Sequence, residues 1–368
     1  MSRKKKLSTA QVIKDAAEIF HGIRWKLGIV VCPYCGSMHI KVYDGYRYKC
    51  NSCKNRFSDR TKTLMHGSKL PISVWMQAIY EMSVDNFISS NVLATKLGIN
   101  QKSAWLLRMK IDYSLPQDRY MLQGVVAQDE MYIGGCLSNY HYSRKWDLLK
   151  KGHYLRGDEK RYTKEALFSL NGDLKQPVFG MNDGDKIVLI ALPNKKKKEY
   201  LWKLGRKYVK RGSVTVSDES KLYDEWERHT GCKLYTNNHH NNQYITHNGL
   251  TSNRIENTFS WYKRGFGARI THCKYHQFYL NEFVFRYNNR FLSTEDMFKE
   301  LVSSTIGKHV TYQEIRKYIP YTEVLSKAEM LRIEKKEKQR LKTLKWILDN
   351  TFAESIESHH RIYRKGDL

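Results

Sequence analysis

The sequence predicts a multidomain protein that joins an N-terminal zinc ribbon, a helical helix-turn-helix-like domain, an α/β domain and a helical C-terminal tail. Three observations carry this prediction. Four cysteines have zinc-ribbon spacing, a glycine separates two helical segments, and apolar strands alternate with helices further along the chain. We place the four domains at residues 1–66, 67–115, 120–300 and 301–368.

The chain is strongly basic. Its 368 residues include 64 Lys and Arg against 37 Asp and Glu, a net charge of +27. Such an excess attracts polyanions, so nucleic acid is the favoured partner and an acidic membrane surface the weaker alternative. No apolar run approaches the roughly 20 residues of a membrane span, and the basic N-terminus lacks the apolar segment of a signal peptide. We therefore expect a cytoplasmic, nucleoid-associated protein.

The N-terminal region combines a helix with a metal-binding hairpin. Residues 8–25 have an amphipathic pattern opened by Ser8 or Thr9. Two strand-like segments then flank Asp44-Gly45, a strong hairpin signal. The pattern C-x2-C-x14-C-x2-C directs two pairs of thiolates at one tetrahedral ion, which favours a structural Zn²⁺ site over a redox CxxC pair. The expected ligands are Cys32, Cys35, Cys50 and Cys53.

Residues 71–112 are predicted to form helices. Gly98 interrupts an apolar helical pattern, and a second pattern begins with the polar residues Gln101 and Lys102. A helix, a tight glycine turn and a second helix with a polar start fit a helix-turn-helix. A plain helical hairpin is the alternative. The basic chain and the preceding zinc ribbon favour DNA contact through Gln101 and Lys102.

The α/β domain is predicted from successive strands and helices. The first strand, GVVAQDEMYIGG, carries Asp129 near its middle. The segments ALFSL, PVFGMND and DKIVLIALPN give two or three more strands, and a helix runs from the lysines at 195–198 to Tyr208. The strand SVTVS ends at Asp218, and we expect the helix ESKLYDEWERH to follow it. This order predicts a sheet flanked by helices.

Two acidic residues occupy unusual places in these strands. Asp129 has apolar neighbours, and an unpartnered buried carboxylate costs roughly several kcal/mol, so it requires a cation or a functional reason. Asp218 either caps the following helix or belongs to a site, because ligand sites in open α/β sheets gather at the carboxyl ends of strands. Glu130 should face the opposite side of the sheet, whereas Asp183 and Asp185 suit a turn.

A third acid stands on the helical segment SNRIENTFSWYK. Ile255, Phe259, Tyr262 and Phe266 share one apolar stripe, with Glu256 at its border and Lys263 seven residues further on. The alternative is a capping box opened by Asn253. Together with Asp129 and Asp218, Glu256 completes a set of oxygen ligands suited to Mg²⁺. Two divalent ions held by such acids activate a water or 3′-hydroxyl and stabilise the leaving oxygen of an in-line displacement.

Several motifs in order resemble one family. The segments CPYCGS, KCNSCKNRFSDRT, QDEMYIGG, VSDESKLY, SNRIENTFSWYKRGFG and YLNEFVFRYNNR are similar to those of bacterial insertion-sequence transposases that join a zinc ribbon to a DDE domain, the branch related to Merlin elements. The likeness runs from about residue 15 to about residue 292. Two features depart from the family pattern, namely the long basic stretch 136–164 and the tail beyond about residue 300.

The resemblance implies a ribonuclease H-like catalytic domain and Mg²⁺-dependent cleavage and strand transfer at terminal inverted repeats, with Mn²⁺ as an alternative ion. It assigns the catalytic and metal-binding roles to Asp129, Asp218 and Glu256. Lys263, with its neighbour Arg264, is expected to contact DNA phosphate. Some branches use asparagine as the third ligand, which leaves Asn253 and Asn257 as alternatives to Glu256.

The leading hypothesis is therefore a DNA transposase that acts on double-stranded transposon ends and target DNA as a homodimer or higher assembly. One alternative is a domesticated zinc-ribbon and helix-turn-helix regulator that binds DNA without catalysis. Another is a metal-dependent nuclease that cuts but does not join.

Overall fold

The computed structural model describes residues 8–85, 87–133, 143, 176–193, 197–237, 250–267, 275–318, 324–332 and 335. The chain separates into two compact units, Met1–Pro320 and Tyr321–Leu368. The predicted strand ALFSL, the basic stretch 138–164 apart from Ser143, the Asn- and His-rich segment 238–249 and most of the C-terminal tail lie outside the described residues. None of the helices described is long and apolar enough to cross a membrane.

The N-terminal region forms the predicted helix and hairpin. The helix divides at Asp15, and the hydroxyl of Ser8 accepts a hydrogen bond from the N–H of Gln11. The hairpin turns through Gly45 and Tyr46, whose φ angles of 68° and 58° lie in the left-handed region. A third strand that the sequence pattern did not indicate completes an antiparallel sheet of order β1-β2-β3. The elements are α1 (Thr9–Lys14), α2 (Ala16–Arg24), the 3₁₀ turn η1 (Lys26–Gly28), β1 (Ile40–Tyr43), β2 (Arg47–Cys50) and β3 (Arg56–Ser58).

The predicted helices of residues 71–112 are confirmed. The second helix ends at Gly98, which adopts the left-handed conformation with φ 64°. The third begins after Asn100, whose side-chain oxygen accepts a 2.8 Å hydrogen bond from the N–H of Ser103. The Gly98 C-cap and the Asn100 N-cap therefore divide this segment into two separate helices. The helices are α3 (Ile72–Val84), α4 (Ser90–Leu97) and α5 (Gln101–Tyr113).

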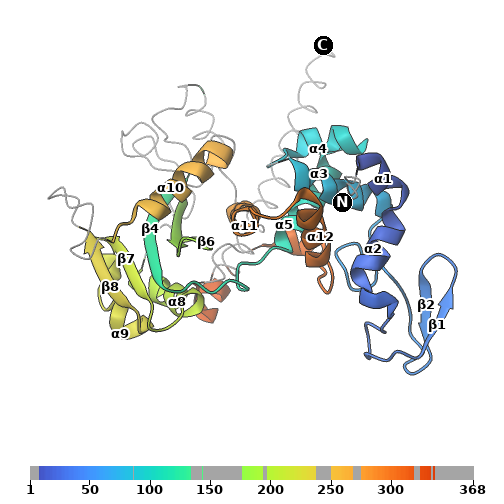
Figure 1. Ribbon diagram of the computed structural model, residues 1–368, viewed down its shortest axis with the longest axis horizontal. Helices are drawn as coiled ribbons and strands as arrows, with labels where there is room; N and C mark the ends of the chain where they lie inside the picture. Colours follow the sequence, from blue (N-terminus) through green and yellow to red (C-terminus); the bar gives the residue numbers. More distant parts are fainter. Residues whose placement is uncertain are drawn as a thin grey trace, which may run out of the picture. The chain divides into compact units, whose positions relative to one another are not determined.

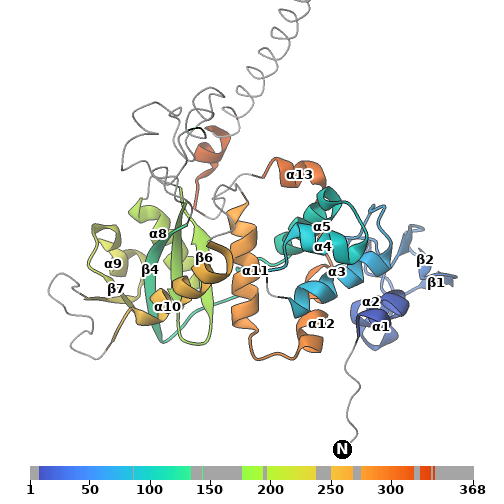
Figure 2. The ribbon, with the colours of Figure 1, turned by 90° about the horizontal axis from the view of Figure 1, so that it is seen from above.

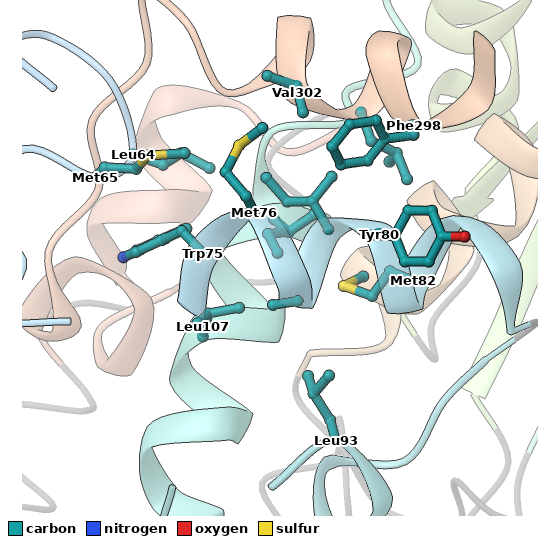
Figure 3. Packing of buried hydrophobic residues seen from close by; sticks show 14 of the residues in the cluster. Leu64, Met65, Trp75, Met76, Tyr80, Met82, Leu93, Leu107, Phe298 and Val302 are labelled. Carbon is teal, nitrogen blue, oxygen red and sulfur yellow. The ribbon is translucent and has the colours of Figure 1, made fainter. Parts of the chain in front are cut away.

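Helix α3 lies in the main helical core. Its residues Trp75, Met76 and Tyr80 are buried, and Met76 and Tyr80 lie toward Val302 and Phe298 of α12 (Thr294–Ser304) (Figure 3). The same core takes buried side chains from α1, α2, α4, α5 and the late helices. Residues far apart in sequence therefore share one apolar cluster. The late helices are α11 (His276–Asn288), α12 (Thr294–Ser304) and α13 (Tyr312–Arg316).

The α/β region contains a five-stranded mixed sheet (Figures 1 and 2). Its order is β6-β5-β4-β7-β8, in which β4 pairs antiparallel with β5 and β5 antiparallel with β6. Strands β4, β7 and β8 run parallel. The predicted helix α8 (Lys198–Tyr208) is confirmed, whereas β8 was not anticipated. The strands are β4 (Val125–Ile133), β5 (Gln176–Asn182), β6 (Ile187–Ala191), β7 (Val214–Asp218) and β8 (Lys233–Asn237).

The prediction of one continuous helix over ESKLYDEWERH is wrong. The segment forms a 3₁₀ turn, Lys221–Tyr223, and a short helix α9, Trp226–Thr230, separated by Glu225 with φ 59°. The break lets two aromatic side chains reach the sheet. Tyr223 donates a 2.7 Å hydrogen bond to Glu130, and Trp226 packs edge-on against Phe179 at 6.5 Å between ring centroids.

Amide side chains cover the outer strand β6. Asn288 accepts from the N–H of Ile187 and donates to its C=O, at 2.8 and 3.0 Å. Gln117 pairs in the same way with Leu189, and Gln277 accepts from the N–H of Ala191. These groups are the ones that a neighbouring strand would otherwise bond.

Candidate catalytic and metal sites

The four cysteines form the predicted metal-binding cluster. Their sulfur atoms all lie within 4.8 Å of one another, with 3.6 Å between Cys32 and Cys53 and between Cys35 and Cys50. Tetrahedral zinc with Zn–S bonds of about 2.3 Å requires sulfurs about 3.8 Å apart, so the arrangement fits. The N–H of Cys53 donates to the Cys50 sulfur and lowers the pKa of Cys50 to about 6, which favours the thiolate that zinc binds.

Strand register brings Asp129 and Asp218 to the same level of the sheet. In the parallel pair β4 and β7, Ala127 lies opposite Val216. Asp129 and Asp218 follow these residues by two positions each, so their side chains point to one face of neighbouring strands about 4.8 Å apart. Asp218 is the last residue of β7. Ser220 caps the following 3₁₀ turn, so Asp218 is not the cap of that turn.

The environment of Asp129 is acidic and partly buried. Burial is the largest cause of a shift that, together with the negative charges of Asp218, Glu130 and Glu256, raises the pKa of Asp129 to about 7, although the hydrogen bond from the N–H of Glu130 opposes it. That N–H donates a 2.7 Å hydrogen bond to an oxygen of Asp129. A carboxylate surrounded by acids is unfavourable by itself and becomes favourable when a cation arrives.

Glu256 reaches this place from helix α10 (Asn253–Tyr262). The predicted stripe is confirmed for Ile255, Phe259 and Tyr262, which are buried. The prediction of Asn253 as the N-cap is wrong. The N-cap is Ser252, and Asn253 is the first residue of the helix. The hydroxyl of Ser252 donates a 2.8 Å hydrogen bond to Glu256, which holds the glutamate over the start of the helix.

A glycine allows α10 to approach the sheet. Gly180 of β5 lies directly opposite Asp129. A Cβ atom at this position would overlap the ring of Phe259 and lie 2.8 Å from Ile255. A second contact fixes the helix along β5, since the amide of Asn182 donates to the Thr258 hydroxyl at 2.9 Å. Close packing at Gly180 therefore sets how near Glu256 lies to Asp129.

The sequence analysis missed Gly180 and Ser252, the two residues that support the position of Glu256. The signal for Gly180 was present, because a glycine inside an apolar strand often marks a close approach of another element. Ser252 had no distinguishing signal beyond its place before a helix. Glu130 lies on the other face of the sheet, as strand alternation predicts, and accepts the hydrogen bond of Tyr223.

The acidic group is more open than the cysteine cluster. Within the residues that the structure describes, only the four cysteines form a group of three or more potential ligands with all ligand atoms within 4.8 Å. Glu256 is exposed, as are Asn253 and Asn257 on the same helix. The structure therefore gathers Asp129, Asp218 and Glu256 around one region without closing them into a compact cage.

The four residues expected to contact DNA are all exposed. Lys263 ends α10 and begins a single π-helical turn, Lys263–Gly267, that also contains Arg264. Lys102 stands in the first turn of α5. Gln101 precedes it and donates a 2.9 Å hydrogen bond to the hydroxyl of Ser90 in α4.

Comparison with known proteins identifies two domains in order. Residues 121–288 match the family described as the ISXO2-like transposase domain, and residues 14–56 match the transposase zinc-ribbon domain. A protein in the transposable element ISH50 of Halobacterium salinarum, described as uncharacterized, is 30% identical over 124 residues, which cover 33% of this chain and 42% of that relative. The chain thus matches less than half the length of this relative.

Among solved structures, the crystal structure of a pre-cleavage Mos1 transpososome is 12% identical, covering 64% of this chain and 80% of that chain at a TM-score of 0.19. A score this low carries no argument about the fold. The two family matches follow one another in the order that the motifs predict, and their zinc-ribbon part coincides with the cysteine cluster. The chain therefore belongs to the insertion-sequence DDE transposases of the ISXO2-like family that carry an N-terminal zinc ribbon.

Proposed function

We propose that this protein is a DNA transposase that binds terminal inverted repeats and catalyses Mg²⁺-dependent strand cleavage and strand transfer through Asp129, Asp218 and Glu256. One observation carries the proposal. The negative charges of Asp218 and Glu256, from a second strand and a helix, both act on the partly buried carboxyl of Asp129 and help raise its pKa to about 7. Three acids on separate elements converge on one position, as a site for divalent cations requires.

The sheet supports a ribonuclease H-like reading of the catalytic domain. Three antiparallel strands are followed in space by two parallel ones, and the first and fourth strands of the sequence, β4 and β7, lie side by side at its centre. These central strands carry Asp129 and Asp218. The arrangement places two acids on adjacent strands and leaves the third to a helix packed on the same face.

The donor set suits magnesium. Asp129, Asp218 and Glu256 offer only oxygen atoms, which Mg²⁺ and Mn²⁺ prefer. A bound ion would supply Lewis-acid stabilisation of the attacking and leaving oxygens. The chain itself holds the ligands, since the Glu130 N–H fixes one oxygen of Asp129 and the Ser252 hydroxyl fixes one oxygen of Glu256. Glu256 is preferred to Asn253 and Asn257 as third ligand because its charge acts on Asp129.

DNA is proposed to contact two further places. Helices α4 and α5 form the helix-turn-helix candidate, with Gln101 and Lys102 at the exposed start of its second helix. Lys263 and Arg264 lie at the end of α10, beyond Glu256, where a phosphate near the cut would meet them. Cleaving and joining two ends requires a homodimer or larger assembly on DNA, working at the nucleoid in the cytoplasm.

The decisive experiment is nicking of a duplex oligonucleotide that carries the element's own terminal repeat. We expect cleavage that depends on Mg²⁺ and is abolished by Asp218→Asn. The matched control is Asp185→Asn, which changes an acid with 68% of its side chain exposed in a turn on the same sheet. Unchanged cleavage in Asp218→Asn would reject the proposed role of Asp218.

The same assay separates the alternative functions. Specific binding of the terminal repeat without any metal-dependent cleavage would indicate a DNA-binding regulator. Cleavage without joining of the released 3′-end to a target duplex would indicate a nuclease. A transposase has to cleave the terminal repeat and join the released 3′-end to the target.

A further inference from the structure

The zinc ribbon has a charged outer face. Alternation along its three strands sends Tyr48 and Phe57 into the small core beside the cysteines, where both are buried. The intervening side chains point the other way. We call this side the basic ribbon face, and it consists of Lys41, Tyr43, Arg47, Lys49, Arg56 and Ser58.

Three cations on this face form one row across the sheet. Lys41 lies directly opposite Lys49, and Lys49 lies directly opposite Arg56. Like charges in directly opposed positions destabilise a sheet, since their Cβ atoms are only about 5 Å apart. No acid belongs to the face, and within the described part of the chain none of the three forms an ion pair. The row is therefore arranged for an anion from outside.

A hollow of about 490 Å³ adjoins the row. Arg47 and Arg56 both line it, together with the hydroxyl-bearing Ser58 and Thr61. Arg47 is held in place because its Nε donates a 2.9 Å hydrogen bond to the C=O of Asp44, the one acid of the lining. Guanidinium groups with adjacent hydroxyls are the usual partners of phosphate oxygens.

We propose that the basic ribbon face binds the phosphate backbone of duplex DNA without reading its sequence. The inference rests on the proposed function and adds a DNA-binding surface to it. Two strand spacings of about 4.8 Å separate Lys41 from Arg56, and one DNA strand carries a charge about every 3.4 Å along the helix axis, so the row spans roughly three phosphates. The zinc then has a second consequence, because it keeps the row of cations in register.

The test is the salt dependence of duplex binding by the full-length, zinc-loaded chain. Fluorescence anisotropy of a labelled duplex would be measured over a range of salt concentrations. The triple variant Lys41→Ala, Lys49→Ala, Arg56→Ala should reduce the slope of log K against log salt by about 2 to 3, because each phosphate contact contributes about 0.9. The reduction should be equal for the terminal repeat and for an unrelated duplex, as expected of contacts to the backbone.

A matched triple variant separates the face from the overall charge of the chain. Lys14→Ala, Lys26→Ala, Lys69→Ala removes three exposed cations from the same N-terminal region but outside the face. Its slope should stay near that of the unchanged protein. The charge-retaining variant Lys41→Arg, Lys49→Arg should also keep the slope. Zinc content and thermal unfolding check that each variant is folded. If the alanine triple is not folded, the double variant Lys41→Gln, Lys49→Gln takes its place.

Three outcomes would overturn the inference: an unchanged slope in the face variant, an equal loss in the control triple, or a loss confined to the terminal repeat. The last would mean that these side chains read bases. Failure here is distinct from failure of the proposed function, which would appear as no metal-dependent cleavage by the unchanged protein. A chain that cleaves normally but loses no salt dependence in the face variant would disprove only the ribbon surface.

Discussion

Two groups of acids in this protein are treated in opposite ways. In the helical core, Asp112 and Glu282 are fully buried beside two arginines, with 2.8 Å between Arg108 and Glu282 and 3.0 Å between Arg286 and Glu282. In the sheet, the charges acting most strongly on Asp129 are those of other acids. The core acids are paired with arginines of the chain, whereas the acids of the sheet repel one another, a repulsion that a cation at the proposed metal site would relieve.

The core group also shows how position within a network decides the ionisation of each acid. Burial raises the pKa of Asp112 well above its usual range, and the charge of Glu282 adds to this. Burial acts on Glu282 too, but the charges of Arg108 and Arg286 outweigh it and lower its pKa. The two arginines therefore favour the ionised form of Glu282, whereas burial favours the neutral form of Asp112.

The largest expected effect comes from removing that centre. Glu282→Gln leaves two arginines buried without their carboxylate, and we expect a loss of about 3–5 kcal/mol in the free energy of unfolding at neutral pH, measured by urea denaturation. Because the pKa of Glu282 is lowered on folding, its contribution is present above its unfolded pKa and disappears as the pH falls. Asp112→Asn is the matched control and should change stability little at neutral pH. Equal losses in the two variants would contradict the division of roles.

A substitution in the sheet should raise the free energy of unfolding instead of lowering it. We expect Asp129→Asn to abolish cleavage and to stabilise the metal-free protein, since it removes a carboxyl whose pKa rises from 3.8 to about 7 on folding. A raised pKa means that the wild-type protein loses stability as the pH rises from about 4 to 7, so the advantage of asparagine grows over that interval and is complete above it. Three pKa units correspond to at most about 4 kcal/mol, reduced here by partial exposure.

Thermal unfolding of the zinc-loaded protein at pH 5 and pH 8, without added Mg²⁺, measures this effect. Asp185→Asn is the control, because its exposed carboxylate should give no such trend. Adding Mg²⁺ should raise the midpoint of the wild-type protein more than that of Asp129→Asn. A stability gain that does not vary with pH would show that Asp129 is not strained by its acidic neighbours.

A smaller effect on stability is expected at the glycine beneath α10. Gly180→Ala forces Phe259 and Ile255 away from the sheet, at about 1–3 kcal/mol. The displacement moves Glu256 relative to Asp129, so cleavage should fall much more than stability does. Gly22→Ala is the matched control, because its Cβ would meet no atom within 4 Å and alanine favours a helix. Normal cleavage by Gly180→Ala would show that the spacing of α10 and β4 is not critical.

The parts of the site that could be predicted from sequence are those with local signals. Cysteine spacing gives the zinc ligands, an acid inside an apolar strand marks Asp129, and a helical stripe places Glu256. The structure adds what depends on distant contacts. Strand β8 was missed because its residues Lys233–Asn237 are partly exposed and show no apolar alternation. The pairing of Arg108 with Glu282 joins positions 174 residues apart, which no local pattern reveals.

The covered edge of β6 bears on how copies of this chain assemble. A bare outer strand is a template for a strand from another molecule, and such pairing is a common route to both dimers and aggregates. Here the N–H and C=O groups of Ile187 and Leu189 are already bonded to side-chain amides. A second copy can extend the sheet at β6 only by first displacing Asn288 and Gln117. The proposed assembly on two DNA ends would therefore join its copies through a surface other than the β6 edge of the sheet.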